Sequence, residues 1–212
     1  MIVLGIVGSP AGGKSTVAKY LQELGATWIN ADLIAREVLE EDAIQAQVLG
    51  HFGSEIAGKD GRIDRSLLAD RVFGDDDEKR AELNYMEGLI HPRTRRIITN
   101  RLRELEQQQE RVAILDVPLL FKSGWDKSCD EIWCVDSDRK LRLMRIRGRG
   151  WDDGELRARE SNQLDIREKR RLSTTLIMNN GTLRQLHGTI DQLWSSLLKR
   201  YEGATEDQHC GE

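Results

Sequence analysis

The segment GSPAGGKST, residues 8–16, constrains the fold of this 212-residue chain more than any other. It follows an apolar run, IVLGIV, and precedes VAKYLQELG, whose apolar residues recur with a helical period. A glycine-rich loop between a buried strand and a helix matches the P-loop pattern G-x-x-x-x-G-K-S. Glycines let backbone N–H groups approach phosphate oxygens, and the helix N-terminus adds its positive dipole end. The segment predicts binding of a nucleoside triphosphate, with Lys14 on its phosphates and Ser15 on Mg²⁺.

Short apolar runs recur along the chain and alternate with helical patterns. They are apolar throughout rather than alternating, which is typical of strands covered on both faces. This order of elements predicts an α/β fold with a parallel sheet flanked by helices. The five runs occupy residues 2–7, 27–30, 111–117, 131–136 and 174–178.

The gap between the second and third runs, residues 31–110, is much longer than one crossover helix requires. It holds several helical patterns, among them DEKRAELNYMEGLI and RTRRIITNRLRELEQQQE on either side of an HP pair. We expect a helical substrate-binding insertion here. The last helical pattern carries an apolar stripe that would pack on the sheet, formed by Leu183, Leu186, Ile190, Trp194 and Leu197.

Composition limits the classes of function. The chain has 32 basic and 36 acidic residues, a net charge of −4, so there is no global basic field for nucleic acid or an anionic membrane. No apolar run approaches the ~18–20 residues that span a bilayer. The three cysteines, Cys129, Cys134 and Cys210, form no CxxC pair, which disfavours a disulfide framework or a zinc site. Together these features predict a reduced, cytoplasmic protein.

The chain lacks the NKxD and DxxG segments that a GTP-dependent switch needs. A small-molecule kinase needs a carboxylate beside the acceptor hydroxyl and arginines over the transferring phosphoryl group. Asp32, directly after the second run, fits the first role, although it could equally cap the following helix. Asp116, at the end of the third run, fits a carboxylate near the magnesium ion, or a turn residue before Val117-Pro118.

The segment RKLRLMRIRGRG concentrates six basic residues between Arg139 and Arg149 in an otherwise acidic chain. A nucleic-acid patch would want interleaved aromatic residues, and none precedes Trp151. A solvated helix face is the other alternative. We favour a phosphate-gripping lid over residues 139–165, with Gly148 and Gly150 as hinge points around Arg149.

Taken together, these motifs resemble the dephospho-coenzyme A kinases. The resemblance runs from residue 2 to about 198 through the segments GSPAGGKST, INADLIAREV, DGRIDRSLLADRVF, LIHPRTR, DVPLLFKSG, RLMRIRGR, RARESNQ and IMNNGTL. It implies a single P-loop kinase domain over 1–212, with the helical insertion, the lid and a flexible tail at 203–212. It also implies a reaction: the γ-phosphoryl group of ATP moves to the ribose 3′-hydroxyl of dephospho-coenzyme A, the last step of coenzyme A synthesis.

The resemblance carries roles onto individual residues. Asp32, Lys14 and Arg149 would be catalytic, and Ser15 with Asp116 would hold Mg²⁺. The ATP site would comprise Gly8, Ala11, Gly12, Gly13, Lys14, Ser15, Thr16, Arg145, Arg149 and Asn179. The acceptor site would comprise Asp32, Arg36, His91, Pro118, Leu119, Leu120, Arg159 and Gln163.

Other interpretations of these residues stay open. His91 could simply end a helix before Pro92, and Gln163 and Asn179 could be exposed polar residues. The leucines of PLL could serve core packing alone. The chain also departs from the family pattern. In the loop, Ser9 and Ala11 replace two glycines, and Ala11 requires a negative φ. Elsewhere Lys122 replaces an acidic residue, Asn30 replaces an aspartate, and Ser173-Thr174 replaces an Ala-Asp pair.

Two rival functions remain at this point. A nucleoside or nucleoside-monophosphate kinase would share the core and the lid. A regulatory ATP-binding module would have no acceptor, although the segments NADLIAR and PLLF argue against it. The expected ligands are ATP and dephospho-coenzyme A, and the oligomeric state stays open.

Overall fold

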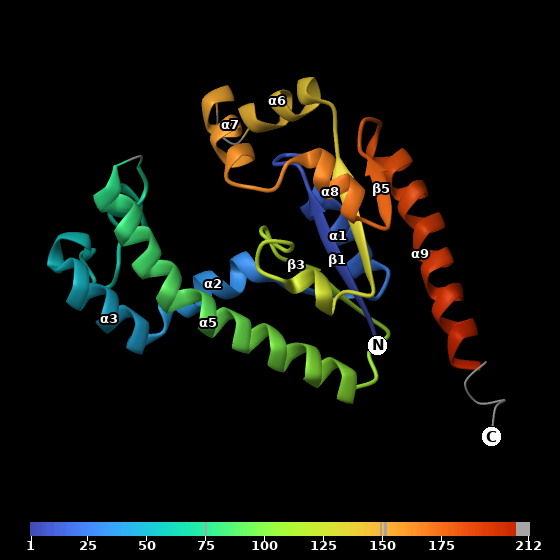
Figure 1. Cartoon of the computed structure of the whole chain (residues 1–212), viewed down its shortest axis with the longest axis horizontal. Helices are drawn as coiled ribbons and strands as arrows, with labels where there is room; N and C mark the ends of the chain where they lie inside the picture. The colour runs from blue at the N-terminus through green and yellow to red at the C-terminus, as the bar shows by residue number, and fades with distance from the viewer. Residues whose placement is uncertain (75, 149, 151, 207–212) are drawn as a thin grey trace. The chain divides into compact units, whose positions relative to one another are not determined.

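The structure is a computed structural model that describes residues 1–74, 76–148, 150 and 152–206 (Figure 1). The chain divides into two compact units. The first unit combines Met1–Asn30 with Glu104–Glu212, and the second is Ala31–Arg103. The second unit nearly coincides with the stretch 31–110 that we expect to be a helical insertion.

A five-stranded sheet forms the centre of the first unit, in the order β2-β3-β1-β4-β5. All four pairings are parallel, which confirms the predicted α/β fold. Because parallel strands end at the same edge, Asn30, Asp116, Gly8, Asp136 and Met178 mark one carboxyl edge of the sheet. The strands are β1 (Ile2–Gly8), β2 (Thr27–Asn30), β3 (Val112–Asp116), β4 (Glu131–Asp136) and β5 (Thr175–Met178).

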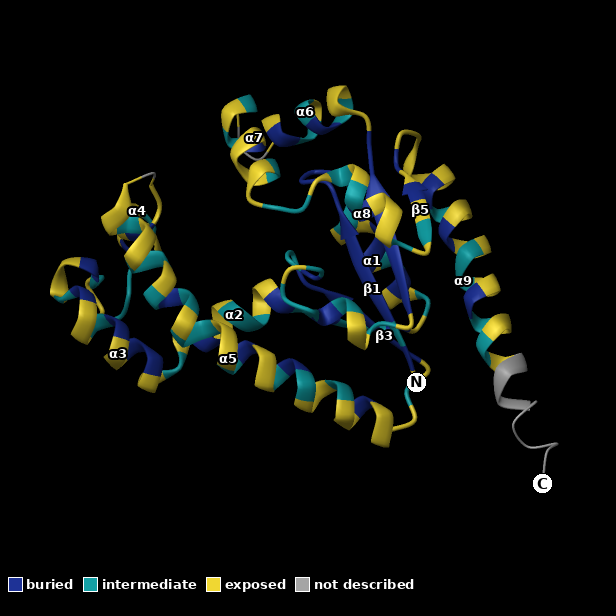
Figure 2. Ribbon diagram, viewed as in Figure 1, coloured by how far each residue is buried: buried dark blue, intermediate teal, exposed yellow. Residues whose placement is uncertain are grey.

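Helices α1 (Lys14–Glu23) and α9 (Leu183–Glu206) cover one face of this sheet. Alternate residues of the strands, such as Leu4 and Ile6 of β1, belong to this core and are fully buried. Figure 2 shows β1 mostly in the dark blue of buried residues. The predicted stripe of α9 is confirmed at Leu186, Ile190 and Leu197, but the prediction was wrong at Leu183, which is 57% exposed. That residue opens the helix, one turn before the stripe reaches the sheet.

Helix α8 (Ile166–Leu172) contacts β1 and β4 from the other face. Trp133 and Val135 of β4 belong to the core under α1 and α9, so the intervening Cys134 points to the opposite face. The strand is therefore buried on both sides, as its unbroken apolar pattern predicts. Residues 125–128 form the short helix η2 (Trp125–Ser128) before β4.

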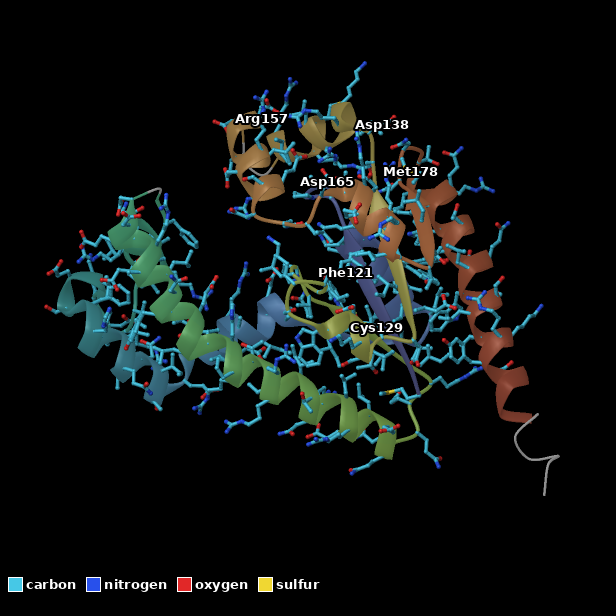
Figure 3. The ribbon with its side chains drawn as sticks, in the orientation of Figure 1. Phe121, Cys129, Asp138, Arg157, Asp165 and Met178 are labelled. Carbon is cyan, nitrogen blue, oxygen red and sulfur yellow. The ribbon has the colours of Figure 1, made fainter. Side chains whose placement is uncertain are left out.

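Helices α6 (Arg139–Arg147) and α7 (Asp153–Ser161) occupy the segment predicted to be a lid. Asp138 and Asp165 stand at the N-terminal ends of α6 and α8, where Figure 3 labels them. The Asp165 carboxylate accepts from the Arg167 N–H at 2.7 Å, which satisfies an otherwise unpaired amide of the first turn of α8. Arg149, which we expect to contact phosphate, lies outside the described residues.

The second unit is built from α2 (Ala31–Glu40), α3 (Asp42–Phe52), the short η1 (Ser54–Ile56), α4 (Arg65–Val72) and most of α5 (Asp77–Gln107). Its own apolar core includes Val38, Val48 and Met86. The sequence patterns predict two helical segments around an HP pair, and this was wrong: α5 continues through Pro92 as one helix of 31 residues. His91 therefore does not end a helix.

No helix within the described ranges combines the length and apolar character needed to cross a membrane. Helix α9 extends to Glu206, so it includes the first residues of the stretch predicted to be a flexible tail. The rest of that stretch, 207–212, lies outside the described residues, as does Cys210. Cys129 and Cys134 are free thiols.

Candidate active site

The loop after β1 has a backbone shape that only glycine tolerates at its two ends. Gly8 has a φ of 154°, and a Cβ added to it would lie 1.9 Å from the Val135 carbonyl oxygen. Gly13 has a φ of 107°, and its Cβ would lie 2.1 Å from Nδ2 of Asn179. Both contacts are far inside van der Waals distance. The glycines of the motif are therefore required by neighbouring backbone and side chains as well as by an approaching phosphate.

Ala11 was expected to require a negative φ, and this was wrong because its φ is 59°. A left-handed conformation costs a non-glycine residue roughly 1–2 kcal/mol. The Ala11 methyl group is 8% exposed and packs in a small apolar cluster with Ile146 of α6 and Leu156 of α7. The residue thus attaches the lid helices to the phosphate-binding loop, and burial of its methyl group offsets part of the strain.

The carbonyl oxygen of Gly12 is held by three side chains from outside the loop. Asn179 Nδ2 donates to it at 3.0 Å, Arg145 Nη1 donates to it at 3.2 Å, and the Ser137 hydroxyl lies 3.0 Å away. A carbonyl anchored in this way fixes the peptide plane, because its oxygen and the next N–H point in opposite directions. Asn179 is 7% exposed, so the alternative of an exposed polar residue was wrong. Its predicted contact with ATP stays a prediction.

Arg145 connects the lid helix α6 to the loop and to the end of β5. Besides Gly12, its guanidinium donates to the Ala11 carbonyl at 3.3 Å, to the Ser137 hydroxyl at 2.7 Å and to the Asn179 carbonyl at 2.8 Å. This planar group suits several acceptors arranged in one plane. The sequence singled out Arg145 as an ATP ligand, and the structure adds its role in shaping the loop.

The sequence analysis missed a buried carboxylate next to the loop. Asp136 ends β4 and is 3% exposed. It accepts from the Ser9 hydroxyl of the loop, from the Ser137 N–H at 2.8 Å and from Arg170 Nε at 3.1 Å. These donors satisfy a charge that would be costly to bury alone. The pattern EIWCVD could have signalled it, because the charged residue is the last of a buried strand, at the edge where the loop lies.

A buried lysine of α8, Lys169, was also missed. Its ammonium donates to the Gly8 carbonyl at 2.9 Å and to Gln163 Oε1 at 2.6 Å. Gln163, predicted to bind the acceptor, is half-buried rather than exposed. Burial, followed by the nearby positive charge of Lys14, lowers the pKa of Lys169 to about 8. The first carbonyl of the loop is therefore held from outside, like that of Gly12.

Ser15 and Asp116 are the two residues predicted to hold Mg²⁺. Ser15 is exposed in the first turn of α1, and Asp116 ends β3 with 9% of its surface exposed. Strands β1 and β3 are neighbours, so the loop and Asp116 belong to the same carboxyl edge. Within the described part of the chain, no group of three or more His, Cys, Asp or Glu side chains could hold a metal ion.

The turn after β3 carries three residues predicted to line the acceptor site. Pro118 and Leu119 are half-buried, whereas Leu120 is 1% exposed. A Cβ on Gly5 of β1 would lie 3.1 Å from Leu120 Cδ1, so this leucine packs on the sheet. Arg159, predicted for the same site, is exposed on α7 and pairs with Glu155 at 2.9 Å.

The other predicted acceptor residues belong to the second unit. Asp32 and Arg36 are exposed four residues apart on α2, and His91 is exposed on α5. Helix α2 begins at Ala31, so Asp32 lies in its first turn and the alternative of an N-cap was wrong. The roles of these three residues toward the nucleotide remain predictions.

A parallel sheet with a P-loop at its carboxyl edge, and an arginine-bearing helical lid packed on that loop, defines a P-loop kinase. A sequence profile of the dephospho-CoA kinases matches residues 2–185. The dephospho-CoA kinase of Rhodopirellula baltica is 40% identical over 199 residues, covering 93% of this chain and 91% of that protein. The chain belongs to the dephospho-CoA kinase family.

Two solved structures show the same fold. The structure of TT1252 from Thermus thermophilus has a TM-score of 0.77 and 31% identity, covering 92% of this chain and 97% of that one. The dephospho-CoA kinase from Campylobacter jejuni has a TM-score of 0.71 and 25% identity, covering 94% and 98%. The resemblance seen in the motifs is thereby confirmed. The activity is therefore that of a dephospho-CoA kinase, which catalyses the final step of coenzyme A synthesis. The two rival functions, a nucleoside or nucleotide kinase and a regulatory ATP-binding module, are not supported.

Proposed function

We propose that this chain holds the γ-phosphoryl group of ATP in the loop 8–13 and transfers it to the ribose 3′-hydroxyl of dephospho-coenzyme A, which Asp32 presents. The observation that carries the proposal is the shape of the loop. Side chains from α6, α8 and the ends of β4 and β5 hold the carbonyls of Gly8 and Gly12. A loop fixed in advance loses little entropy when it binds phosphate.

Lys14 begins α1 and supplies an ammonium where the free N–H groups of the helix converge. Positive charge at this point neutralises the β- and γ-phosphates and the charge that develops during transfer. Thr16 and the loop residues complete the phosphate site. Arg149 adds a second positive charge from the lid, as the resemblance implies.

Mg²⁺ fits the same place. The Ser15 hydroxyl and the Asp116 carboxylate would hold it, since they offer the oxygen ligands that this ion prefers. When bound, the ion would offset the negative charge of the phosphates. Neither side chain needs a further metal-binding residue nearby, because Mg²⁺ is commonly held by one or two protein groups in kinases.

The acceptor role belongs to Asp32. Its carboxylate orients the 3′-hydroxyl or accepts its proton, and Arg36, one helical turn later, pairs with phosphate or with Asp32. The remainder of the acceptor site comprises His91, Pro118, Leu119, Leu120, Arg159 and Gln163. We expect neither nucleic acid nor a membrane as a partner because the net charge is −4, and we expect a cytoplasmic protein because the three cysteines form no CxxC pair.

The proposal is tested by following ADP release with ATP, Mg²⁺ and one acceptor at a time. Dephospho-coenzyme A should support release, and the product should carry a new 3′-phosphate. AMP, adenosine and an acceptor-free reaction should give only background release, since closing of the lid excludes water. Release that is the same with and without dephospho-coenzyme A would refute the proposal.

A further inference from the structure

Lys169 places an ammonium group in a buried position. The residue is only 4% exposed and lies on the side of α8 that packs against the sheet. Moving an ammonium out of water costs several kcal/mol unless partners replace its hydration. Packing alone does not explain a lysine at this position, because a methionine would fill a similar space without the free-energy cost of burying a charge.

The partners of the ammonium are neutral. They are the backbone carbonyl of Gly8 at 2.9 Å and the side-chain carbonyl of Gln163 at 2.6 Å. Gly8 is the first residue of the phosphate-binding loop, and Gln163 follows the last lid helix, α7. One side chain therefore joins the loop to the end of the lid segment.

Groups of both signs lie around this ammonium. Lys14 of α1 and Lys122 of the turn after β3 lower its pKa, while Cys134 and Asp136 of β4 raise it. Lys122 is held close to the Lys169 partner Gln163, because the Lys122 ammonium donates to the carbonyl of the preceding residue, Asn162, at 3.0 Å. With burial as the largest cause, the pKa of Lys169 falls from 10.5 to about 8.

A cavity of about 190 Å³ adjoins Lys169 and is walled by loop and lid together. Its charged walls include Arg139 and Arg142 of α6, Glu160 of α7 and Asp165 before α8. Arg142 pairs with Glu160, and Asp165 caps α8, so these carboxylates already have partners. Asp136, the other carboxylate near Lys169, is paired with Arg170, so Lys14, Lys122 and Lys169 leave a local excess of positive charge beside the loop.

We propose that Lys169 is a positioning residue of the ATP site: its ammonium ties the Gly8 carbonyl to Gln163, and its charge is balanced only when nucleotide phosphates occupy the loop beside Lys14. The inference rests on the proposed placement of ATP at this loop. The proposal explains why a lysine is buried here: attraction between its ammonium and the bound phosphates offsets the free-energy cost of its burial.

A consequence is a proton coupled to nucleotide binding. Phosphate beside the ammonium favours its charged form, so ATP raises the pKa of Lys169 above the value of about 8 in the free protein. By linkage, ATP then binds more weakly as the pH rises beyond 8, because binding must take up a proton. A purely structural lysine would affect stability without this dependence.

The experiment compares MgATP affinity, measured by calorimetry from pH 7 to pH 9.5, for the wild type, K169M, K169R and K199M. Lys199 is an exposed lysine of α9 and serves as the matched control. At pH 7, K169M should bind ATP about tenfold more weakly and should lose the fall in affinity above pH 8. K169R should restore most of the affinity at pH 7, and K199M should behave as the wild type.

Wild-type affinity and wild-type pH dependence in K169M would overturn the inference. If K169M does not fold, the wild-type lysine signals are titrated by NMR with ¹³C-labelled lysine, and K169R identifies the signal of Lys169. Its midpoint should lie near 8 and move upward with ATP; an unmoved midpoint would overturn the inference. A wild type that binds no ATP at all would instead refute the proposed function, so the two failures are distinguishable.

Discussion

The side-chain amide of Asn179 donates to the carbonyl of Gly12 at 3.0 Å, joining two residues that are 167 positions apart in the chain. The same asparagine also blocks a side chain at Gly13, because a Cβ added there would lie 2.1 Å from the Asn179 Nδ2 atom. The phosphate-binding loop is therefore formed jointly by the motif near the N-terminus and by the segment after the last strand. This arrangement yields a sharp test of which glycines matter.

Gly13→Ala should destabilise the protein by about 2 kcal/mol or more, because the new methyl group meets Asn179 and the φ of 107° disfavours a side chain. The matched control is Gly188→Ala in the middle of α9, where nothing lies within 4 Å of an added Cβ. That variant should gain about 0.5–1 kcal/mol from lower backbone entropy in the unfolded chain. Urea unfolding measures both, and equal effects of the two changes would contradict the described loop.

Lys14→Met should reduce the rate of phosphoryl transfer about 10²–10³-fold, the usual loss when one preorganised charge is removed from a site. Lys19→Met provides the control, because Lys19 is an exposed lysine on the same helix. Steady-state ADP release measures both rates. A Lys14→Met enzyme within a few-fold of the wild type would show that the charge on the phosphates comes from elsewhere.

Asp32→Asn should lose about 10²–10⁴-fold in transfer rate, the range for a general base, while ATP affinity stays unchanged. The P-loop does not include this residue, so binding and transfer should separate. Asp70→Asn, at an exposed acid on α4, controls for the lost charge. Turnover close to that of the wild type would remove Asp32 from the acceptor role.

The stability of the wild type relative to K169M should depend on pH with a defined sign. The folded-state pKa of Lys169 is lowered from 10.5 to about 8, so the unfolded chain binds more protons between these values. The free energy of unfolding of the wild type should therefore rise relative to K169M across pH 8 to 10.5, with a limiting slope of about 1.4 kcal/mol per pH unit. Below pH 8 the difference should be constant. Denaturant unfolding across this range measures it, and a difference that does not vary with pH would contradict the described burial.

Local patterns in the sequence were enough to predict the sheet and the loop. Each strand is an unbroken apolar run, because both of its faces are covered, and the glycine motif lies between the first such run and a helix. The family resemblance added Asn179, Arg145 and Gln163 as site residues.

What the sequence could not reveal depends on tertiary contacts. Lys169 stands in the run REKRRL among similar charged residues, and only the packing of α8 on the sheet distinguishes it. Pro92 suggests a break, yet buried residues on either side of it, Met86 and Ile98, stabilise one continuous helix. Ala11 takes a left-handed conformation because its methyl group packs under the lid, which no local rule indicates.

The most direct test of the account is a crystal structure with a non-hydrolysable ATP analogue, Mg²⁺ and dephospho-coenzyme A bound together. The γ-phosphate should lie against the loop and Lys14, and the ribose 3′-oxygen should lie within hydrogen-bond distance of the Asp32 carboxylate, in line with the γ-phosphorus. A ribose bound far from Asp32, or phosphates bound away from the loop, would contradict it.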